Sequence, residues 1–118
     1  MDGKTVFTLL MLLLGTRAWA QPVETFATAM LVADPKAPLA SVQKLTAILT
    51  AKGGHVDAVS STGSFIQARF PGADWAYAVL EHADPGVPLQ VIFLVCHTAR
   101  ERATALCEDI KQRYNAGK

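Results

Sequence analysis

The first 20 residues of this 118-residue chain limit what the rest can fold into, because they have the layout of a cleavable secretory signal peptide. Lys4 gives a positive start, an apolar run follows over residues 6–14, and Ala18-Trp19-Ala20 forms an Ala-x-Ala cleavage pattern. The apolar run is shorter than the roughly 20 residues that a membrane span needs, although an uncleaved membrane anchor is the alternative. We therefore expect cleavage after Ala20, a mature chain without a membrane span, and a periplasmic or secreted protein.

The mature chain has the size and charge of one small globular domain. Cleavage leaves residues 21–118, with nine of the 11 basic and nine of the 10 acidic residues, so its formal charge is zero. No run of like charges occurs, which argues against nucleic-acid binding and against a polybasic membrane contact. Leu, Val, Ile, Phe and Ala are plentiful enough for a packed core, so we expect a folded domain rather than disorder.

Both cysteines, Cys96 and Cys107, lie in the mature part of the chain. In an exported protein, an even number of cysteines indicates disulfide formation, and only one pairing is possible within this chain. Such a bond closes a loop of about ten residues and contributes roughly 2–3 kcal/mol. Two buried free thiols are the alternative.

The first half of the mature chain predicts a strand followed by a helix. The apolar run Phe26–Ala33 is stopped by Asp34-Pro35, and its length favours a strand with both faces covered. Residues Leu39–Lys52 have helical periodicity, and Gly53-Gly54 tolerates the positive φ that ends a helix. The apolar stripe of this helix comprises Leu39, Val42, Leu45, Ile48 and Leu49.

A β-hairpin is expected next. The runs His55–Ser60 and Phe65–Phe70 have β-type composition and flank a four-residue turn with glycine, residues 61–64. Side chains alternate along a strand, so Phe65, Gln67 and Arg69 share one face of the second run, which we expect to be partly open to water. On the paired run, His55 and Asp57 extend this mixed aromatic and polar surface.

The last part predicts a helix, a strand and a second helix. Residues Ala73–Ala83 read as a short helix with Asp74 as its cap and Trp75, Val79 and Leu80 on its apolar side. On this helix Trp75 belongs to the core and Tyr77 is a candidate contact. Leu89–Cys96 reads as a buried strand. Thr98 and Glu101 match a capping box, and a helix from Ala99 to near Gly117 follows, with an apolar stripe of Ala99, Ala103, Leu106, Cys107, Ile110 and Tyr114.

The expected order is therefore β-α-β-β-α-β with an additional C-terminal helix. This order predicts an α+β domain with a ferredoxin-like antiparallel sheet and two helices on one face. The extra helix either covers an end of the sheet or lies on its otherwise open face.

No catalytic or cofactor-binding constellation is found in the sequence. Cys96-His97 is an adjacent nucleophile–base pair, but neighbours on a strand point to opposite faces. The histidines His55, His82 and His97 lie on separate elements and lack metal-ligand spacing, so no metal site and no cofactor are predicted. Catalytic residues are not assigned, and a non-enzymatic role is favoured.

We interpret the chain as an exported domain that binds another envelope or secreted protein, or a second copy of itself as a homodimer, through its sheet face. Aromatic residues and arginine are enriched in such interfaces. The alternative is a small ligand-binding domain or a cofactor-free enzyme with a pocket between the sheet and the terminal helix, using His97, His55 or Arg69. The candidate binding residues are Phe65, Gln67, Arg69, His55, Asp57 and Tyr77.

Overall fold

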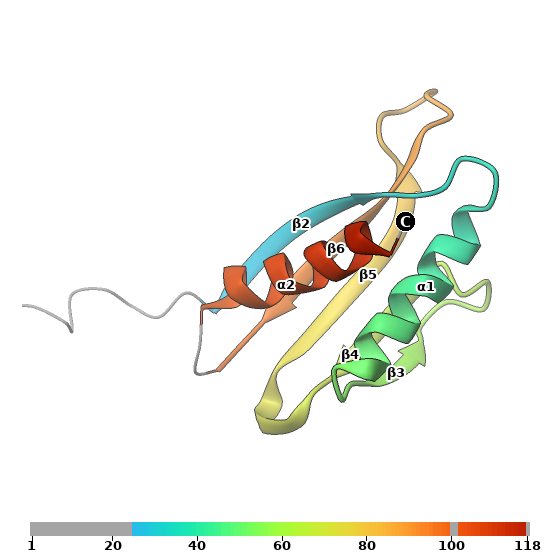
Figure 1. Cartoon of the computed structure of the whole chain (residues 1–118). Coiled ribbons are helices and arrows are strands. Elements are labelled where there is room, and N and C mark those ends of the chain that lie inside the picture. The colour runs from blue at the N-terminus through green and yellow to red at the C-terminus, as the bar shows by residue number, and fades with distance from the viewer. Residues whose placement is uncertain (1–24, 100–101, 118) are drawn as a thin grey trace, which may run out of the picture.

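The computed structural model describes residues 25–99 and 102–117, which form a five-stranded sheet and two helices (Figure 1). The predicted signal peptide, residues 1–20, lies outside the described residues. In chain order the elements are β2 (Phe26–Val32), α1 (Pro38–Ala51), β3 (His55–Ala58), β4 (Phe65–Arg69), the short 3₁₀ turn η2 (Pro71–Ala73), β5 (Trp75–His82), β6 (Gln90–His97) and α2 (Ala103–Ala116).

The strands lie in the order β2-β6-β5-β4-β3, and every neighbouring pair is antiparallel. Strands β3 to β6 follow one another as a meander, and α1 carries the chain from edge strand β2 to edge strand β3. The predicted α+β class is confirmed. The ferredoxin-like order is not matched, because a strand, β5, stands where the second helix was expected.

Both helices cover the same face of the sheet (Figure 1), where α2 packs on β2 and β6 and α1 packs on β3, β4 and β5. Their apolar side chains and the inward side chains of the strands form one core. The C-terminal helix therefore leaves the opposite face of the sheet uncovered. The buried members of the core are Leu31, Val42, Leu45, Leu49, Ile66, Ala68, Ala76, Ala78, Ile92, Leu94, Cys96, Cys107, Ile110 and Tyr114.

The prediction of a helix over residues 73–83 is wrong, since Trp75–His82 forms β5 in the middle of the sheet. The spacing of the apolar residues fitted a helix, but the same residues also alternate between large and small. Ala76 and Ala78 are 1% exposed beneath the helices, and Trp75 lies on the opposite face instead of in the core. Asp74 does not cap a helix, because its carboxylate accepts a hydrogen bond from the Ala99 backbone N–H at 3.0 Å.

Strand β2 also differs from its expected environment. It is an edge strand with one covered face: Leu31 is buried beneath α2, whereas Phe26, Thr28, Met30 and Val32 are exposed. A continuous apolar run predicts two covered faces, but within this run large exposed side chains alternate with mostly smaller covered ones.

The structure confirms the helix over α1 and the β3–β4 hairpin that the sequence predicts. Val42, Leu45 and Leu49 are buried, although Leu39 at the start of the predicted stripe is 44% exposed. Gly53 has a φ of +91° and ends the helix as expected. The hairpin pairs β3 with β4, with His55 opposite Arg69.

Neither helix of the described part of the chain is long and apolar enough to cross a membrane.

The C-terminal helix begins at Ala103, four residues later than predicted, and β6 ends at His97, one residue later than predicted. Thr98 therefore does not stand at the N-cap of α2, which is Arg102. The other member of the predicted capping box, Glu101, lies outside the described residues.

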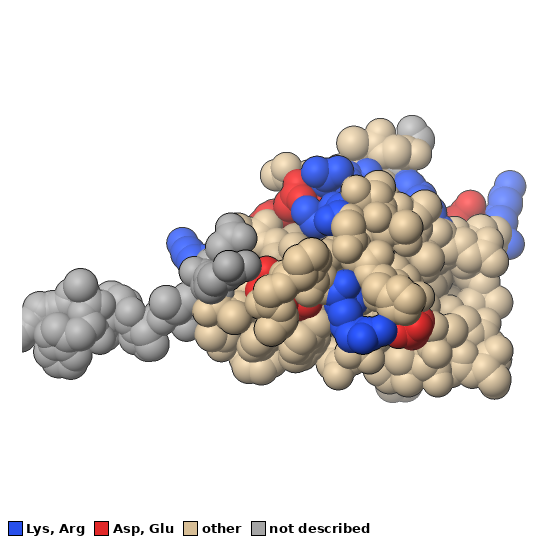
Figure 2. Space-filling view, turned by 90° about the horizontal axis from the view of Figure 1, so that it is seen from below, with Lys and Arg blue, Asp and Glu red and all other residues tan. Residues whose placement is uncertain are grey.

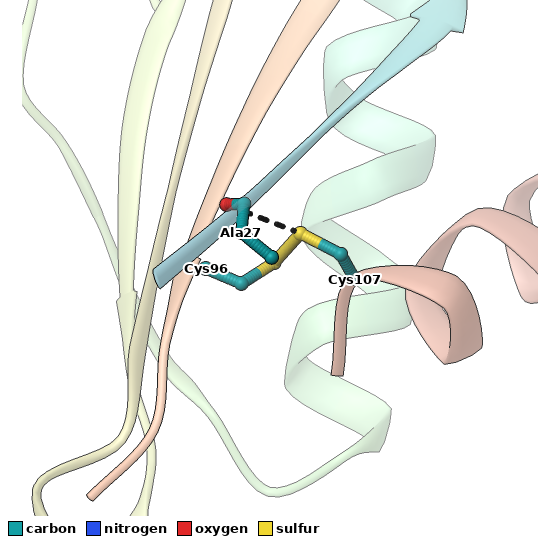
Figure 3. The surroundings of a disulfide bond; sticks show 3 residues. All are labelled: Ala27, Cys96 and Cys107. Carbon is teal, nitrogen blue, oxygen red and sulfur yellow. Dashed lines mark hydrogen bonds between the residues drawn. A yellow bond between two sulfur atoms is a disulfide. The ribbon is translucent and has the colours of Figure 1, made fainter. Parts of the chain in front are cut away.

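A disulfide between Cys96 and Cys107 joins β6 to α2 (Figure 3), as predicted. The two Cα atoms are 5.8 Å apart, and both residues are almost completely buried. The Cys107 sulfur also lies 3.6 Å from the Ala27 carbonyl oxygen, a van der Waals contact because a disulfide sulfur carries no proton to donate. The bond therefore fixes α2 over the β2–β6 pair, and it suits an oxidising, extracellular compartment.

An ion pair between Lys52 and Asp109 connects the end of α1 to α2, and Arg113 contacts the same carboxylate at 3.2 Å. The hydrogen bond from Lys52 is the largest effect and holds the pKa of Asp109 below its ordinary value of 3.8; burial opposes it, and the hydrogen bond from Arg113 lowers the pKa further. A pKa lowered by folding stabilises the folded state above the unfolded-state pKa. The stabilisation is lost as the pH falls through the folded-state pKa.

Asp109→Asn is expected to lower the free energy of unfolding at pH 7 by less than about 1 kcal/mol, because the carboxylate is partly exposed. The difference from wild type is expected to shrink as the pH falls below 3.8 and the wild-type carboxyl becomes protonated. Urea unfolding at neutral and acidic pH measures both. Asp84→Asn, in the exposed turn after β5, serves as the control; an Asp109→Asn effect that persists undiminished in acid contradicts this account.

Candidate functional site

The sheet face opposite the helices is the candidate functional site. Residues that lie opposite each other on paired strands project to the same side of a sheet, so the registers place one set of side chains on this face. We call it the open face. It comprises Phe26, Thr28, Met30 and Val32 of β2; Val91, Phe93, Val95 and His97 of β6; Trp75, Tyr77, Val79 and Glu81 of β5; Phe65, Gln67 and Arg69 of β4; and His55 and Asp57 of β3.

The side chains of the open face form four rows that run across the strands. The first row is Phe26, His97, Trp75, Arg69 and His55. The second is Thr28, Val95, Tyr77, Gln67 and Asp57; the third is Met30, Phe93, Val79 and Phe65; and the fourth is Val32, Val91 and Glu81.

Aromatic rings pack together at one end of the open face. The His97 ring lies between Phe26, at 4.9 Å between centroids, and Trp75, on which it stacks at 5.0 Å with planes 8° apart. Tyr77 continues the contact from Trp75 at 4.6 Å and reaches Phe65 at 5.8 Å. The buried Nδ1 atom of His97 has no hydrogen-bond partner among the described residues, so stacking holds this ring in place.

The part of the open face that β3 and β4 contribute is polar, apart from Phe65. The Asp57 carboxylate lies 3.2 Å from both the Arg69 guanidinium and Nε2 of His55, and Gln67 lies next to it in the register. We call His55, Asp57, Gln67 and Arg69 the polar corner. The ion pairs of Asp57 are well exposed, so they contribute little to stability and remain available to solvent or to another molecule.

All six candidate binding residues lie on the open face. Phe65, Gln67, Arg69, His55 and Asp57 occupy the positions expected from the hairpin. Tyr77 joins them from β5, not from a helix, and pairs directly with Gln67.

Sequence reasoning missed the larger, apolar half of this face. That half comes mainly from β2, β5 and β6, where the alternation of large and small residues was the signal available. Its principal members are Phe26, Met30, Val32, Trp75, Phe93 and His97.

The adjacent Cys96 and His97 do not form a nucleophile–base pair. The Cys96 sulfur is bonded to Cys107 on the helix-covered side, whereas the His97 ring lies on the open face. His82 lies at the end of β5, apart from the other histidines, and its Nδ1 atom is 3.0 Å from the Val87 carbonyl oxygen. Within residues 25–99 and 102–117, no group of three or more His, Cys, Asp or Glu side chains could hold a metal ion.

A cavity of about 470 Å³ lies at the end of β2, away from the open-face residues that the alternative function would use. Residues of α1, among them Ser41 and Lys44, line it together with Val32 and Tyr114. The Lys44 amine lies 4.4 Å from the centre of the Tyr114 ring, whose hydroxyl donates to the Val32 carbonyl at 2.7 Å. His97, His55 and Arg69 do not line this cavity, so a ligand bound there would depend on Lys44 and Tyr114 instead.

Charged side chains form no large patch of one sign on the face shown in Figure 2. Lys and Arg side chains lie beside Asp and Glu side chains, and most of that surface belongs to uncharged residues.

The fold and the open face define the chain as a small α+β domain whose antiparallel sheet is covered by two helices on one side only. No protein-family model matches the chain, and no curated protein is similar enough to count as a match. The open face is therefore the feature of the molecule from which a function can be inferred.

Proposed function

We propose that the mature chain is an exported, non-enzymatic interaction domain that forms a homodimer by packing its open face against the open face of a second copy. The observation that carries this proposal is the exposure of large apolar side chains on an ordered sheet face. Phe26 and Met30 are each 59% exposed and Val32 is 53% exposed, all on one strand. Contiguous apolar patches of this kind mark sites of protein association.

The area of the open face fits a small, specific interface. Five strands spaced about 4.8 Å apart give a width of about 24 Å, and four rows give a length of about 20 Å. If every row of all five strands is covered, two such faces treated as flat bury roughly 1,000 Å², which is the lower limit for a specific interface.

A second copy suits this face because a symmetric dimer requires a patch that complements itself. Most of the open face is uncharged, so two copies can pack without placing like charges opposite each other at the centre. The polar corner contains both signs of charge, Arg69 and Asp57, and can remain hydrated at the edge of the contact.

The test is the mass of the secreted, disulfide-bonded chain in solution, measured by sedimentation equilibrium. Wild type is expected to be a dimer. Met30→Glu is expected to be a monomer, because it places a charge within the apolar half of the contact. Leu39→Glu is the matched control, because Leu39 is 44% exposed on α1, on the helix-covered side, and this variant is expected to remain a dimer.

Circular dichroism establishes that both variants are folded. A wild-type chain that is monomeric over the whole concentration range overturns the proposal, even if it captures a different protein. Equal dissociation of Met30→Glu and Leu39→Glu also overturns it, since the contact would then not lie on the open face.

A further inference from the structure

Polarity on the open face changes across the strands, not along them. At one side, β2 contributes only apolar side chains and Thr28, and β6 contributes three apolar side chains and His97. At the other side, β3 contributes His55 and Asp57, and β4 contributes Gln67 and Arg69 besides Phe65. The face therefore has an apolar half and a polar half that meet near β5.

Symmetry leaves two ways to pack this face on itself with aligned strands. Aligned sheets keep their strand directions within about 30° of each other, so the two-fold axis in the plane of the contact runs either along the strands or across them. An axis along the strands places β2 of one copy over β3 of the other. An axis across the strands places β2 over β2 and β4 over β4.

The axis along the strands is energetically unfavourable. It places Thr28 over Asp57 and Phe26 over His55, so the ion pairs of the polar corner are removed from water beneath apolar side chains. Burial of charges costs several kcal/mol per ion unless new partners replace the water, and β2 offers none.

From this gradient, and given the dimer proposed above, we infer that the two copies are related by a two-fold axis that runs across the strands. The apolar half of each copy then packs on the apolar half of the other. Both polar corners lie at the edge of the contact, towards the β3–β4 hairpin turn of the other copy.

The same axis provides a partner for Glu81. This carboxylate lies in the fourth row and has no ion pair among the described residues. An axis between the second and third rows places the fourth row over the first row of the other copy, which contains Trp75 and Arg69. Glu81 then lies over Trp75 of the other copy, and the column of Arg69 is about 4.8 Å to the side, across the gap of about 10 Å between the packed sheets.

Cross-linking of engineered cysteines tests the direction of the axis. Thr28→Cys and Gln67→Cys each place one thiol in the second row, at opposite sides of the face. The native cysteines are bonded and buried, so a short bismaleimide linker reacts only with the new thiol. Each variant is treated alone and as an equimolar mixture of the two, with Leu39→Cys as the control for chance collisions.

The axis across the strands is expected to give linked dimers from Thr28→Cys alone and from Gln67→Cys alone, with no additional mixed product. Linkage only in the mixture shows an axis along the strands and overturns the inference while the dimer stands. Linkage in the Thr28→Cys sample with none in the Gln67→Cys sample shows pairing of β2 edges and overturns the inference. Linkage in the Gln67→Cys sample with none in the Thr28→Cys sample also overturns it. A monomer in sedimentation is a separate result that overturns the dimer itself.

Discussion

Replacing Cys96 and Cys107 together by alanine is expected to lower the free energy of unfolding by roughly 2–3 kcal/mol and the melting temperature by about 10–20 °C. The disulfide closes a loop with a sequence separation of 11 residues, and its loss increases the conformational entropy of the unfolded chain. Alanine is the appropriate replacement because a serine would bury a hydroxyl group in the core. Thermal unfolding followed by circular dichroism measures the difference.

Helix α2 is expected to remain in place in this double variant at room temperature, because Ala103, Ile110 and Tyr114 still bury their side chains. The control is wild type treated with dithiothreitol. Both sulfurs are buried, so the disulfide is expected to resist reduction until urea unfolds the chain. Rapid reduction of the native protein, or a double variant that melts with wild type, would contradict this role of the disulfide.

Leu45→Ala is expected to lower the free energy of unfolding by about 3–5 kcal/mol, since removing a fully buried leucine leaves a cavity as well as lost apolar contact. Leu45 is 0% exposed and lies in the middle of α1, on the core of the sheet. Such a loss is a large part of the 5–15 kcal/mol by which a domain of this kind is usually stable. Urea unfolding at constant temperature measures it.

The matched control is Leu39→Ala, the same substitution on the same helix at a position that is 44% exposed. It is expected to change stability by less than about 1 kcal/mol, since little apolar contact is lost. Similar effects at the two positions would mean that α1 is rotated about its axis relative to the sheet.

Several parts of the fold could be predicted from the sequence because neighbouring residues determine them. The periodicity of Val42, Leu45 and Leu49 predicts one face of α1, and Gly53 supplies the positive φ at its end. The turn between β3 and β4 is likewise encoded by neighbouring residues. The disulfide could be predicted because two cysteines allow only one pairing within the chain. Five of the six candidate residues were placed on the correct strands for this reason.

Residues 73–83 show the limit of a prediction made from neighbouring residues alone, because the helix expected there is a strand. Alanines at Ala76 and Ala78 are compatible with a helix, and Trp75, Val79 and Leu80 have helical spacing. They form a strand because β4 and β6 offer hydrogen-bonding partners on both sides, and because small side chains are needed beneath α1. This is a tertiary effect that no window of sequence contains.

The sequence by itself determined the elements whose hydrogen bonds and apolar contacts close within a few residues: α1, the β3–β4 hairpin, the run that becomes β6 and the pairing of Cys96 with Cys107. Only the tertiary structure decided that β2 is an edge strand, that β5 replaces a helix, and that both helices cover the same side. The open face is a consequence of those three choices. Pairing between distant strands depends on partners far away in the chain, and for that reason the apolar half of the candidate site emerges only in the folded sheet.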